Sequence, residues 1–389
     1  MNNKEFTEKY YIDRTKNLSV KWQRGKKMNC LPMWIADMDF KMDQRLIDAL
    51  NEFIAKGDFG YMNLPQDYYD VFTGWHQKRH NVQYKQEWIR FSRGAIDAIH
   101  QVVNALSDEK DGILITTPLY PPFASTIKNS VRRLYESKMI DNDGFFTFDY
   151  KDIEKKFKTG RIKMFMLCSP HNPLGRVFKK GELEELFELC RKYNVLICAD
   201  EVHCDLIMPD QEFLPAHSFS KYRNRMVTIT AAAKTFSLAL FSHCHIIIAD
   251  PKLRKRFIAY QQKTHKGSIN VFNALPTYYS YQFGEEWLDA FNNVVFENYS
   301  YIRKELGKDL EICTLEGSYL LFINLEGYCQ GKTAFDTLVK DCSIVANAGE
   351  TFAKGYESWA RLNLATSLKN IRKAVRNIKK LINSNPLNT

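Results

Sequence analysis

The hydrophobic and polar positions along the middle of the chain alternate between short apolar runs and amphipathic stretches. Apolar runs predict strands at residues 112–117, 162–168, 195–199, 226–230 and 244–249. Between several of these runs the apolar positions recur at helical spacing, most clearly at residues 179–193. Because alternating strands and helices imply a mainly parallel sheet covered on both faces, the pattern predicts an α/β fold.

The two ends of the chain depart from this alternation. Residues 1–30 are rich in Lys, Asn and Tyr and are expected to form an irregular arm. Apolar spacing predicts helices near 43–56, 66–79 and 96–106 before the alternating region, and near 285–306, 333–340 and 369–383 after it. Strands are expected at 319–324 and 361–364, among the last helices, and this mixture is typical of a smaller α+β unit.

These patterns divide the chain into three expected segments. Residues 1–44 would form the N-terminal arm and part of a small domain, residues 45–285 a large domain, and residues 286–389 the C-terminal small domain. No repeat and no low-complexity linker separates them, so we expect the domains to be in close contact.

Several chemically useful side chains directly follow the predicted strands. Ligands of parallel sheets bind at the carboxyl ends of the strands, so residues that follow different strands can meet in one site. The residues that follow the first four strands here are Tyr120, Asn172, Asp200, His203 and Lys234. Their convergence predicts a binding site at one edge of the sheet.

Lys234 follows an apolar strand and three alanines. A buried lysine is costly unless its charge is neutralised or used, because burial disfavours the ammonium form. One use is a Schiff base with an aldehyde, for which a lowered pKa makes the amine nucleophilic. Taken alone, Lys234 also suits an ordinary position at a strand end, and the neighbouring strand ends favour the chemical role.

Two other stretches have a structural and a functional interpretation. Gly94 stands where a helix begins, and bare backbone N–H groups there can bind an anion, although a simple turn explains the glycine equally well. In residues 33–40 two acids alternate with apolar groups. This segment suits a packed loop before a helix that Asp43 caps, and it equally suits a wall of the binding site. No GxGxxG and no P-loop occurs, so the dinucleotide and nucleoside-triphosphate fingerprints are absent.

The composition limits which kinds of binding partner and which cellular compartment we expect for this protein. The chain has 389 residues and a net charge of +10, but its basic residues form short clusters and no nucleic-acid module signature occurs. We therefore expect no nucleic-acid partner, and the charge suits an anionic small molecule. The nine cysteines include no CxxC pair, which is typical of reduced thiols in a cytoplasmic protein. The N-terminus is polar and does not resemble a secretory signal, and no apolar run reaches the ~18 residues that a membrane span needs. We therefore expect a cytoplasmic protein without a membrane segment.

Four motifs together resemble fold-type I pyridoxal-phosphate enzymes of the aminotransferase class I/II superfamily. They are Lys234 in Lys-Thr-Phe, Asp200 in Ala-Asp-Glu-Val-His, Asn172 in Ser-Pro-His-Asn-Pro-Leu-Gly-Arg-Val, and Arg361 in Ala-Arg-Leu-Asn-Leu-Ala. Within this superfamily, residues 33–40 and 200–203 resemble the MalY/PatB-type cystathionine β-lyases, including cystalysin-like carbon–sulfur lyases. The resemblance covers nearly the whole chain. It implies a homodimer whose large domain has a mainly parallel, seven-stranded-type sheet, with a smaller α+β domain.

The resemblance also implies roles for residues around pyridoxal 5'-phosphate. Lys234 would bond to the cofactor and move protons at the substrate Cα, Asp200 would pair with the pyridinium nitrogen, and Tyr120 would stack on the ring as a third catalytic residue. Arg361 would bind the substrate carboxylate bidentately. The further implied cofactor ligands are Asn172, Gly94, Ala95, Ile96, His203, Thr230 and, from the other subunit, Tyr61; the further implied substrate contacts are Asn172, Ile35 and Ala36.

The implied activity is α,β-elimination on cysteine-type or cystathionine-type amino acids, which gives a thiol, pyruvate and ammonia. An aminotransferase of class I/II is the alternative, because both activities share their first steps. A third interpretation is a catalytically weakened homologue that regulates or binds a partner.

The chain departs from the family pattern at several positions. Family members usually carry a serine phosphate ligand where Ala233 stands, and loss of that hydrogen bond would cost roughly 1.5–3 kcal/mol, which Thr230 could partly offset. Leu240 replaces a small residue, and Pro121 stands where a second tyrosine is common. His243 and His245 have a spacing that could suggest a metal site, but on a strand it also places two residues on one face, and we expect no metal.

Overall fold

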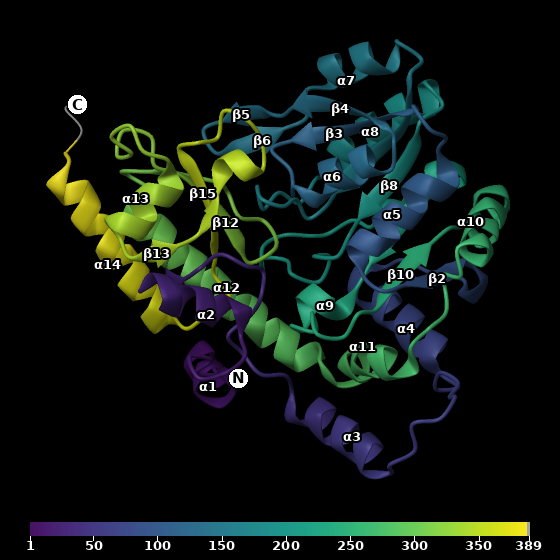
Figure 1. Cartoon of the computed structure of the whole chain (residues 1–389), viewed down its shortest axis with the longest axis horizontal. Helices are drawn as coiled ribbons and strands as arrows, with labels where there is room; N and C mark the ends of the chain where they lie inside the picture. Colours follow the sequence, from purple (N-terminus) through teal and green to yellow (C-terminus); the bar gives the residue numbers. More distant parts are fainter. Residues whose placement is uncertain (387–389) are drawn as a thin grey trace.

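The computed structural model describes residues 1–386, and its largest element is a seven-stranded sheet (Figure 1). The strands are β2 (Ile89–Ser92), β3 (Gly112–Thr117), β4 (Arg133–Lys138), β7 (Ile162–Cys168), β8 (Leu196–Asp200), β9 (Met226–Thr230) and β10 (Cys244–Ile247). Their order is β2-β10-β9-β8-β7-β3-β4, and β10 alone runs antiparallel to its neighbours. The expectation of an α/β fold with a mainly parallel seven-stranded sheet is confirmed.

Both faces of the sheet are buried, which explains why its strands read as continuous apolar runs. Ile113 and Ile115 belong to the core beneath α5 (Ala95–Leu106), α6 (Pro122–Asn129) and α10 (Pro251–Lys263). Leu114, between them, belongs to the core on the opposite face, with α7 (Tyr150–Phe157) and α8 (Lys180–Lys192). Successive side chains of a strand point to opposite faces, so a sheet covered on both sides needs apolar residues at every position.

A smaller antiparallel sheet stands beside the large one. Its strands are β11 (Glu311–Ile312), β12 (Leu320–Asn324), β15 (Trp359–Asn363) and β14 (Asn347–Ala348), in that order. The helices of this part are α12 (Glu285–Leu306), α13 (Ala334–Lys340) and α14 (Leu368–Ser384), and α12 packs against α14. Ile371, Ala374, Val375, Ile378 and Leu381 are the buried face of α14, as the sequence pattern predicts. The smaller α+β unit is therefore present.

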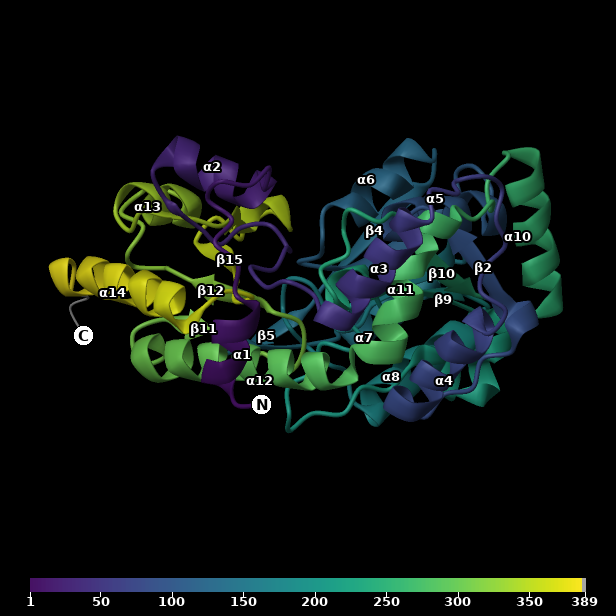
Figure 2. The same cartoon turned by 90° about the horizontal axis from the view of Figure 1, so that it is seen from below.

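The N-terminal segment is helical, so the expectation of an irregular arm at residues 1–30 is wrong. It forms α1 (Asn3–Tyr10) and α2 (Val20–Met28), which lie beside the small sheet and its helices in Figure 2. The Asn2 side chain accepts from the Glu5 N–H and the Glu5 carboxylate accepts from the Asn2 N–H, which caps α1. Phe6 and Tyr10, one turn apart, are buried and α1 packs against α12. Tertiary packing thus stabilises a helix whose polar composition gave little signal.

The sequence pattern also missed elements of the main sheet. β2 and β4, the two edge strands, were not predicted, and the fifth predicted strand ends at residue 247 rather than 249. The remaining elements of the large part are α3 (Gln44–Ala55), α4 (Tyr68–His80), the hairpin of β5 (Ile140–Asn142) with β6 (Phe145–Thr147), α9 (Ala232–Thr235) and α11 (Val271–Phe283). Both edge strands contain polar residues, so neither forms the continuous apolar run that marks the other strands of this sheet.

The N-terminal segment contacts the C-terminal third of the chain. β1 (Leu31–Pro32) pairs in parallel with β13 (Ile344–Val345), and α2 packs against both strands. The division at residues 44 and 285 stays a prediction. Within residues 1–386, no helix combines the length and the apolar character that crossing a membrane requires.

Candidate active site

A cavity of about 440 Å³ lies at the carboxyl ends of the parallel strands, between the large sheet and the small one. Most of the residues singled out from the sequence line it, although they come from segments far apart in the chain. These are Ile35, Ala36, Gly94, Ala95, Ile96, Tyr120, Asn172, Asp200, His203, Lys234 and Arg361. Such convergence follows from the topology, because β3, β7, β8 and β9 are neighbours and end at the same edge.

Two residues of the predicted site do not line this cavity. Tyr61 lies in the loop between α3 and α4 with its side chain fully exposed. Thr230 is buried at the end of β9, where its hydroxyl lies 3.7 Å from the Cys204 Sγ. The Thr230 hydroxyl therefore does not line the cavity. Tyr61 is expected to contribute to the partner subunit's site, and that role stays a prediction.

Lys234 belongs to the short helix α9, directly after β9, and is half-buried. Its Nζ donates to the carbonyl oxygen of Ala36 at 3.1 Å, and no acidic side chain pairs with it among the described residues. Burial lowers the pKa of the Lys234 amine, and the nearby Arg361 guanidinium lowers it further. Both effects favour the neutral amine, which is the nucleophilic form.

Asp200 is the last residue of β8 and is buried. It accepts one backbone hydrogen bond, from the Val202 N–H at 3.2 Å, and forms no ion pair with a described residue. Burial raises the pKa of the Asp200 carboxyl to about 7. A buried carboxylate without a cationic partner is costly, so this group fits a ligand that brings a positively charged nitrogen, such as a pyridinium.

Arg361 lies on β15 of the small sheet and is buried. Its guanidinium donates to the Asn172 side-chain oxygen at 2.8 Å, to the Asn347 side-chain oxygen at 2.7 Å and to the Trp34 carbonyl at 3.1 Å. Its Nε has no partner, and no carboxylate pairs with it among residues 1–386. Burial lowers the pKa of Arg361 to about 10. The Arg361 guanidinium is positioned by neutral oxygens and keeps its charge available, so it suits a bidentate contact with an incoming carboxylate.

Gly94 starts α5 at the remaining end of the cavity. Its φ of 150° is readily adopted only by glycine. The first backbone N–H groups of an α-helix lack intrahelical partners, and the positive end of the helix dipole points the same way. Ala95 and Ile96, which contribute two of these N–H groups, line the cavity. This end therefore suits an anion such as a phosphate.

Residues 33–40 act both as a packed loop and as a wall of the cavity. The buried Asp39 pairs with the buried Lys21 at 2.9 Å and anchors the loop from behind. The Asn363 amide donates to the carbonyl oxygens of Ile35 at 2.6 Å and Asp37 at 2.7 Å. These contacts turn the Ala36 carbonyl toward Lys234, so the two interpretations of the sequence are compatible.

The sequence reasoning missed several cavity residues. Asn347 pairs in register with Arg361 across β14 and β15, and Trp34 supplies a carbonyl to the same guanidinium. His243 also lines the cavity, although its spacing with His245 had suggested only a strand face or a metal. The pattern of residues 33–40 could have identified Trp34 as a cavity residue, whereas no local sequence pattern indicates that Asn347 lies in the site.

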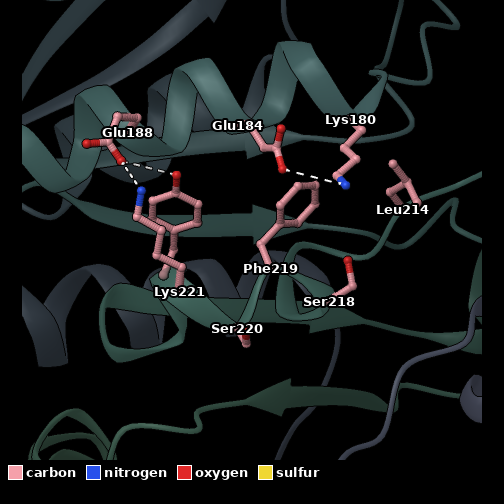
Figure 3. Close-up of a pocket in the computed structure, with 9 residues that line it drawn as sticks. Lys180, Glu184, Glu188, Leu214, Ser218, Phe219, Ser220 and Lys221 are labelled. Atoms are coloured by element: carbon pink, nitrogen blue, oxygen red, sulfur yellow. Dashed lines mark hydrogen bonds and ion pairs between the residues drawn. The ribbon is translucent and has the colours of Figure 1, made fainter.

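A larger hollow of about 700 Å³ lies between α8 and residues 214–222 (Figure 3). Its charged groups pair with each other. Glu188 contacts the Lys221 amine at 2.9 Å and the Tyr222 hydroxyl at 3.2 Å, and Lys180 lies 3.9 Å from Glu184. With its charges compensated, this hollow has less to offer a charged ligand than the cavity at Lys234.

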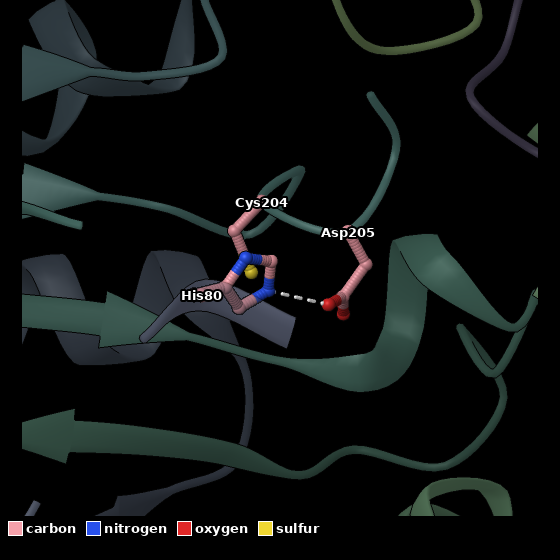
Figure 4. Close-up of side chains that lie close together, drawn as sticks. All are labelled: His80, Cys204 and Asp205. Atoms are coloured by element: carbon pink, nitrogen blue, oxygen red, sulfur yellow. Dashed lines mark hydrogen bonds and ion pairs between the residues drawn. The ribbon is translucent and has the colours of Figure 1, made fainter. Parts of the chain in front are cut away.

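His80, Cys204 and Asp205 lie close together in the core (Figure 4). Asp205 accepts from the His80 Nε2 at 2.7 Å, and also from the Trp75 indole at 3.0 Å and the Thr235 hydroxyl at 2.9 Å. Burial alone would raise the pKa of Asp205, but the hydrogen bond and charge of His80, together with the nearby His76 ring and the Trp75 indole, hold it at about 2. The carboxylate thus anchors the residue that follows Lys234, and its oxygens already have donors.

Known proteins resemble this chain over most of its length. The family model for aminotransferase class I and II matches residues 38–378. The cystathionine beta-lyase PatB of Bacillus subtilis is 30% identical over 94% of this chain and 97% of its own length, and the protein MalY of Escherichia coli is 24% identical over 94% and 95%.

Solved structures agree with these relatives. A PLP-bound putative aminotransferase from Clostridium difficile superposes with a TM-score of 0.90 at 33% identity, covering 96% of this chain and 98% of that one. Cystalysin from Treponema denticola, which contains a pyridoxal 5'-phosphate cofactor, has the same TM-score and coverage at 28% identity. Since the family model spans most of the sequence and the solved structures share the fold, the chain belongs to the aminotransferase class I and II family.

Proposed function

We propose that this chain is a pyridoxal-phosphate-dependent carbon–sulfur β-lyase that acts on cystathionine-type or cysteine-type amino acids. One observation carries the proposal: a single cavity holds Lys234, Arg361 and Asp200, and none of the three forms an ion pair with another residue in the part of the chain that the structure describes. In that order, these three groups match an aldehyde, a carboxylate and a pyridinium nitrogen. Relatives named cystathionine beta-lyase, which the chain covers almost completely, support the substrate class.

The cavity residues would hold the cofactor by complementary chemistry. Lys234 would attach it covalently, Asp200 would pair with its ring nitrogen, and Tyr120 would stack on its ring. Asn172 would donate to its phenolic oxygen, and the N–H groups of Ala95 and Ile96 would bind its phosphate. Bound there, pyridoxal phosphate supplies an electron sink for the negative charge that develops at the substrate Cα.

The chain itself orients the substrate and moves its proton. Arg361 binds the α-carboxylate through its planar fork, with Asn172 and Asn347 fixing the guanidinium. Ile35 and Ala36 form the wall opposite Lys234. Once the substrate amine has displaced it from the cofactor, the Lys234 amine, whose pKa is lowered by burial, would take the proton from Cα, and the Cβ–S bond would break to release the β-thiolate.

We further propose that the active form is a homodimer. The side chains of Phe59 and Tyr61 are exposed in the loop after α3, where a second copy of the chain could cover them. In that arrangement Tyr61 would reach the phosphate end of the partner's cavity. All nine cysteines are free, which supports a reducing compartment such as the cytoplasm.

The test is turnover without an amino-group acceptor. Purified protein is incubated with pyridoxal phosphate and cystathionine or cysteine, and pyruvate and released thiol are measured. Equal amounts of both products without an added oxo acid support the lyase. Turnover that requires an oxo acid would replace it with aminotransferase activity, which the name of the Clostridium difficile neighbour favours.

A further inference from the structure

The end of the cavity beside α5 carries one more inference, which rests on the proposed cofactor. Backbone N–H groups of Ala95 and Ile96 face this end, and Arg93 lines it without an ion pair to any described residue. Ala233 contributes only a methyl group there, and the Thr230 hydroxyl lies outside the cavity beside Cys204. Neither of the two expected positions therefore supplies a buried side-chain donor for a phosphate.

His243, which directly precedes β10, is the buried polar side chain that reaches this end. Its side chain is 5% exposed, and it lines both the main cavity and an adjoining hollow of about 510 Å³. Arg93 and Ser242 line the same two spaces, which places His243 beside the start of α5. The Nε2 of His243 lies 2.6 Å from the Tyr68 hydroxyl, whereas its Nδ1 has no hydrogen-bond partner among residues 1–386 and is not enclosed by protein.

Tyr68 determines which nitrogen of His243 carries the proton. Its hydroxyl also lies 2.8 Å from the Nε2 of His245, so it donates to one ring and accepts from the other. The Nδ1 of His245 is enclosed and makes no hydrogen bond within residues 1–386, so a proton there would be less well satisfied than one on Nε2, which lies against the Tyr68 hydroxyl. His245 therefore carries its proton on Nε2 and donates to Tyr68.

The chain of donors then ends at the unpaired Nδ1 of His243. Because His245 donates to Tyr68, the Tyr68 hydroxyl donates to the Nε2 of His243, and the proton of the His243 ring is left on Nδ1. Burial lowers the pKa of His243 to about 4, so the ring is neutral near pH 7 and carries this proton alone. A phosphate oxygen needs a donor, and Nδ1–H is one.

We propose that His243 is a side-chain ligand of the cofactor phosphate, donating from Nδ1, and that Tyr68 is the positioning residue that selects this tautomer. The imidazole would take over the contact that Ala233 cannot make. The recognised chemistry is a phosphate monoester, so the contact distinguishes pyridoxal phosphate from unphosphorylated pyridoxal.

The test compares these two ligands on the full chain after its cofactor has been removed. Dissociation constants for pyridoxal phosphate and for pyridoxal are measured by absorbance for wild type, His243→Phe and His243→Asn. His243→Phe keeps the ring volume and removes the donor, and we expect its affinity for pyridoxal phosphate to fall by about tenfold or more while pyridoxal binding stays unchanged. His243→Asn places an amide nitrogen near the position of Nδ1, and we expect it to retain most of the wild-type preference.

Two further measurements separate a phosphate contact from general destabilisation. His217→Asn changes an equally buried histidine that does not line the cavity, and it should leave the ratio of the two dissociation constants unchanged. Inorganic phosphate should raise the Tm of the cofactor-free wild type more than that of His243→Phe. Nitrogen-15 NMR should show His243 protonated at Nδ1, and Tyr68→Phe should remove that tautomer preference.

An unchanged ratio in His243→Phe would overturn the proposal, as would an equal loss of both ligands or a His243 protonated at Nε2 in wild type. Failure of the lyase assay would leave these binding results intact, because none of them measures turnover. If the wild type bound neither ligand covalently, the proposed function would fail, and the inorganic phosphate comparison would still decide whether His243 binds a phosphate.

Discussion

The Nζ of Lys234 donates to the carbonyl oxygen of Ala36 at 3.1 Å, although 198 positions separate the two residues. This contact joins the large sheet to the N-terminal loop and holds the amine over the cavity. Because a carbonyl accepts from either protonation state of the amine, it orients Lys234 without stabilising the ammonium form as a carboxylate would. The lysine is thus positioned and remains easy to deprotonate.

Replacing Lys234 with Ala should abolish covalent cofactor attachment. After incubation with pyridoxal phosphate and treatment with borohydride, the wild type should gain the mass of the reduced cofactor and the variant should not. Lys221→Ala changes an exposed lysine in the hollow beside α8. It is the matched control, and it should gain the same mass as the wild type. A labelled peptide at the site in Lys234→Ala would show that another amine attaches the cofactor.

Asp200 makes the stability of the cofactor-free protein depend on pH. Its pKa is raised to about 7, above the unfolded value near 4, so the folded state holds the proton more tightly. The stability that this group contributes is complete below pH 4 and is lost as the pH rises toward 7, by up to about 1.4 kcal/mol per pH unit. Urea unfolding of wild type and Asp200→Asn at pH 5 and pH 7 should show a shallower loss in the variant.

Adding pyridoxal phosphate provides the control for this titration. A pyridinium paired with Asp200 would favour its charged form, so the loss of stability between pH 5 and pH 7 should shrink in the wild type. Burial also raises the pKa of Glu201 to about 8, so Glu201 contributes to the pH dependence of stability in both proteins. The contribution of Asp200 is therefore the difference in pH dependence between the wild type and Asp200→Asn. Identical pH profiles for both would contradict the assignment.

Arg361→Lys should impair recognition of the substrate while leaving cofactor binding intact. A lysine cannot present a planar fork to a carboxylate, so we expect the KM for cysteine-type substrates to rise roughly 10- to 100-fold. Steady-state kinetics would measure this rise, and the absorbance titration with pyridoxal phosphate should be unchanged. Inhibition by cysteamine, which lacks the carboxylate, should be equal in both proteins, and a selective loss of cysteamine binding would argue against this role.

The buried ion pair of Lys21 with Asp39 should stabilise the wall of the cavity. Lys21→Met leaves a buried carboxylate without its cation, and unfolding by urea should show a loss of about 3–5 kcal/mol. Lys4→Met breaks an exposed pair with Glu8 and should cost less than about 1 kcal/mol. A double variant, Lys21→Met with Asp39→Leu, should recover much of the loss, because neither charge is then left alone.

Mixed dimers would test the contribution of Tyr61. We expect Lys234→Ala and Tyr61→Ala each to have little activity, and an equimolar mixture after subunit exchange to regain roughly a quarter of the wild-type sites. A hybrid dimer has one cavity with Lys234 and the partner's tyrosine intact. No recovery despite exchange, measured by mass spectrometry of the intact dimers, would place Tyr61 outside the partner's site.

The sequence alone determined the class of fold and most of the residues around the cavity. Continuous apolar runs mark strands buried on both faces, and the side chains that follow such strands meet at one edge, which predicts that Asn172, Asp200 and Lys234 lie together. Both steps rest on local patterns. The roles of these residues stay predictions that the experiments above address.

Only the tertiary structure decided which backbone and which polar groups complete the cavity. Ala36 reaches Lys234, Asn363 orients the loop that carries Ala36, and His243 lines the phosphate end, in each case through contacts between distant segments. The N-terminal helices were missed for the same reason, since α1 is stabilised by burial of Phe6 against α12, and α2 packs against β1 and β13. Hydrophobic periodicity reports the face that an element buries, whereas the partner of that face is set by long-range packing.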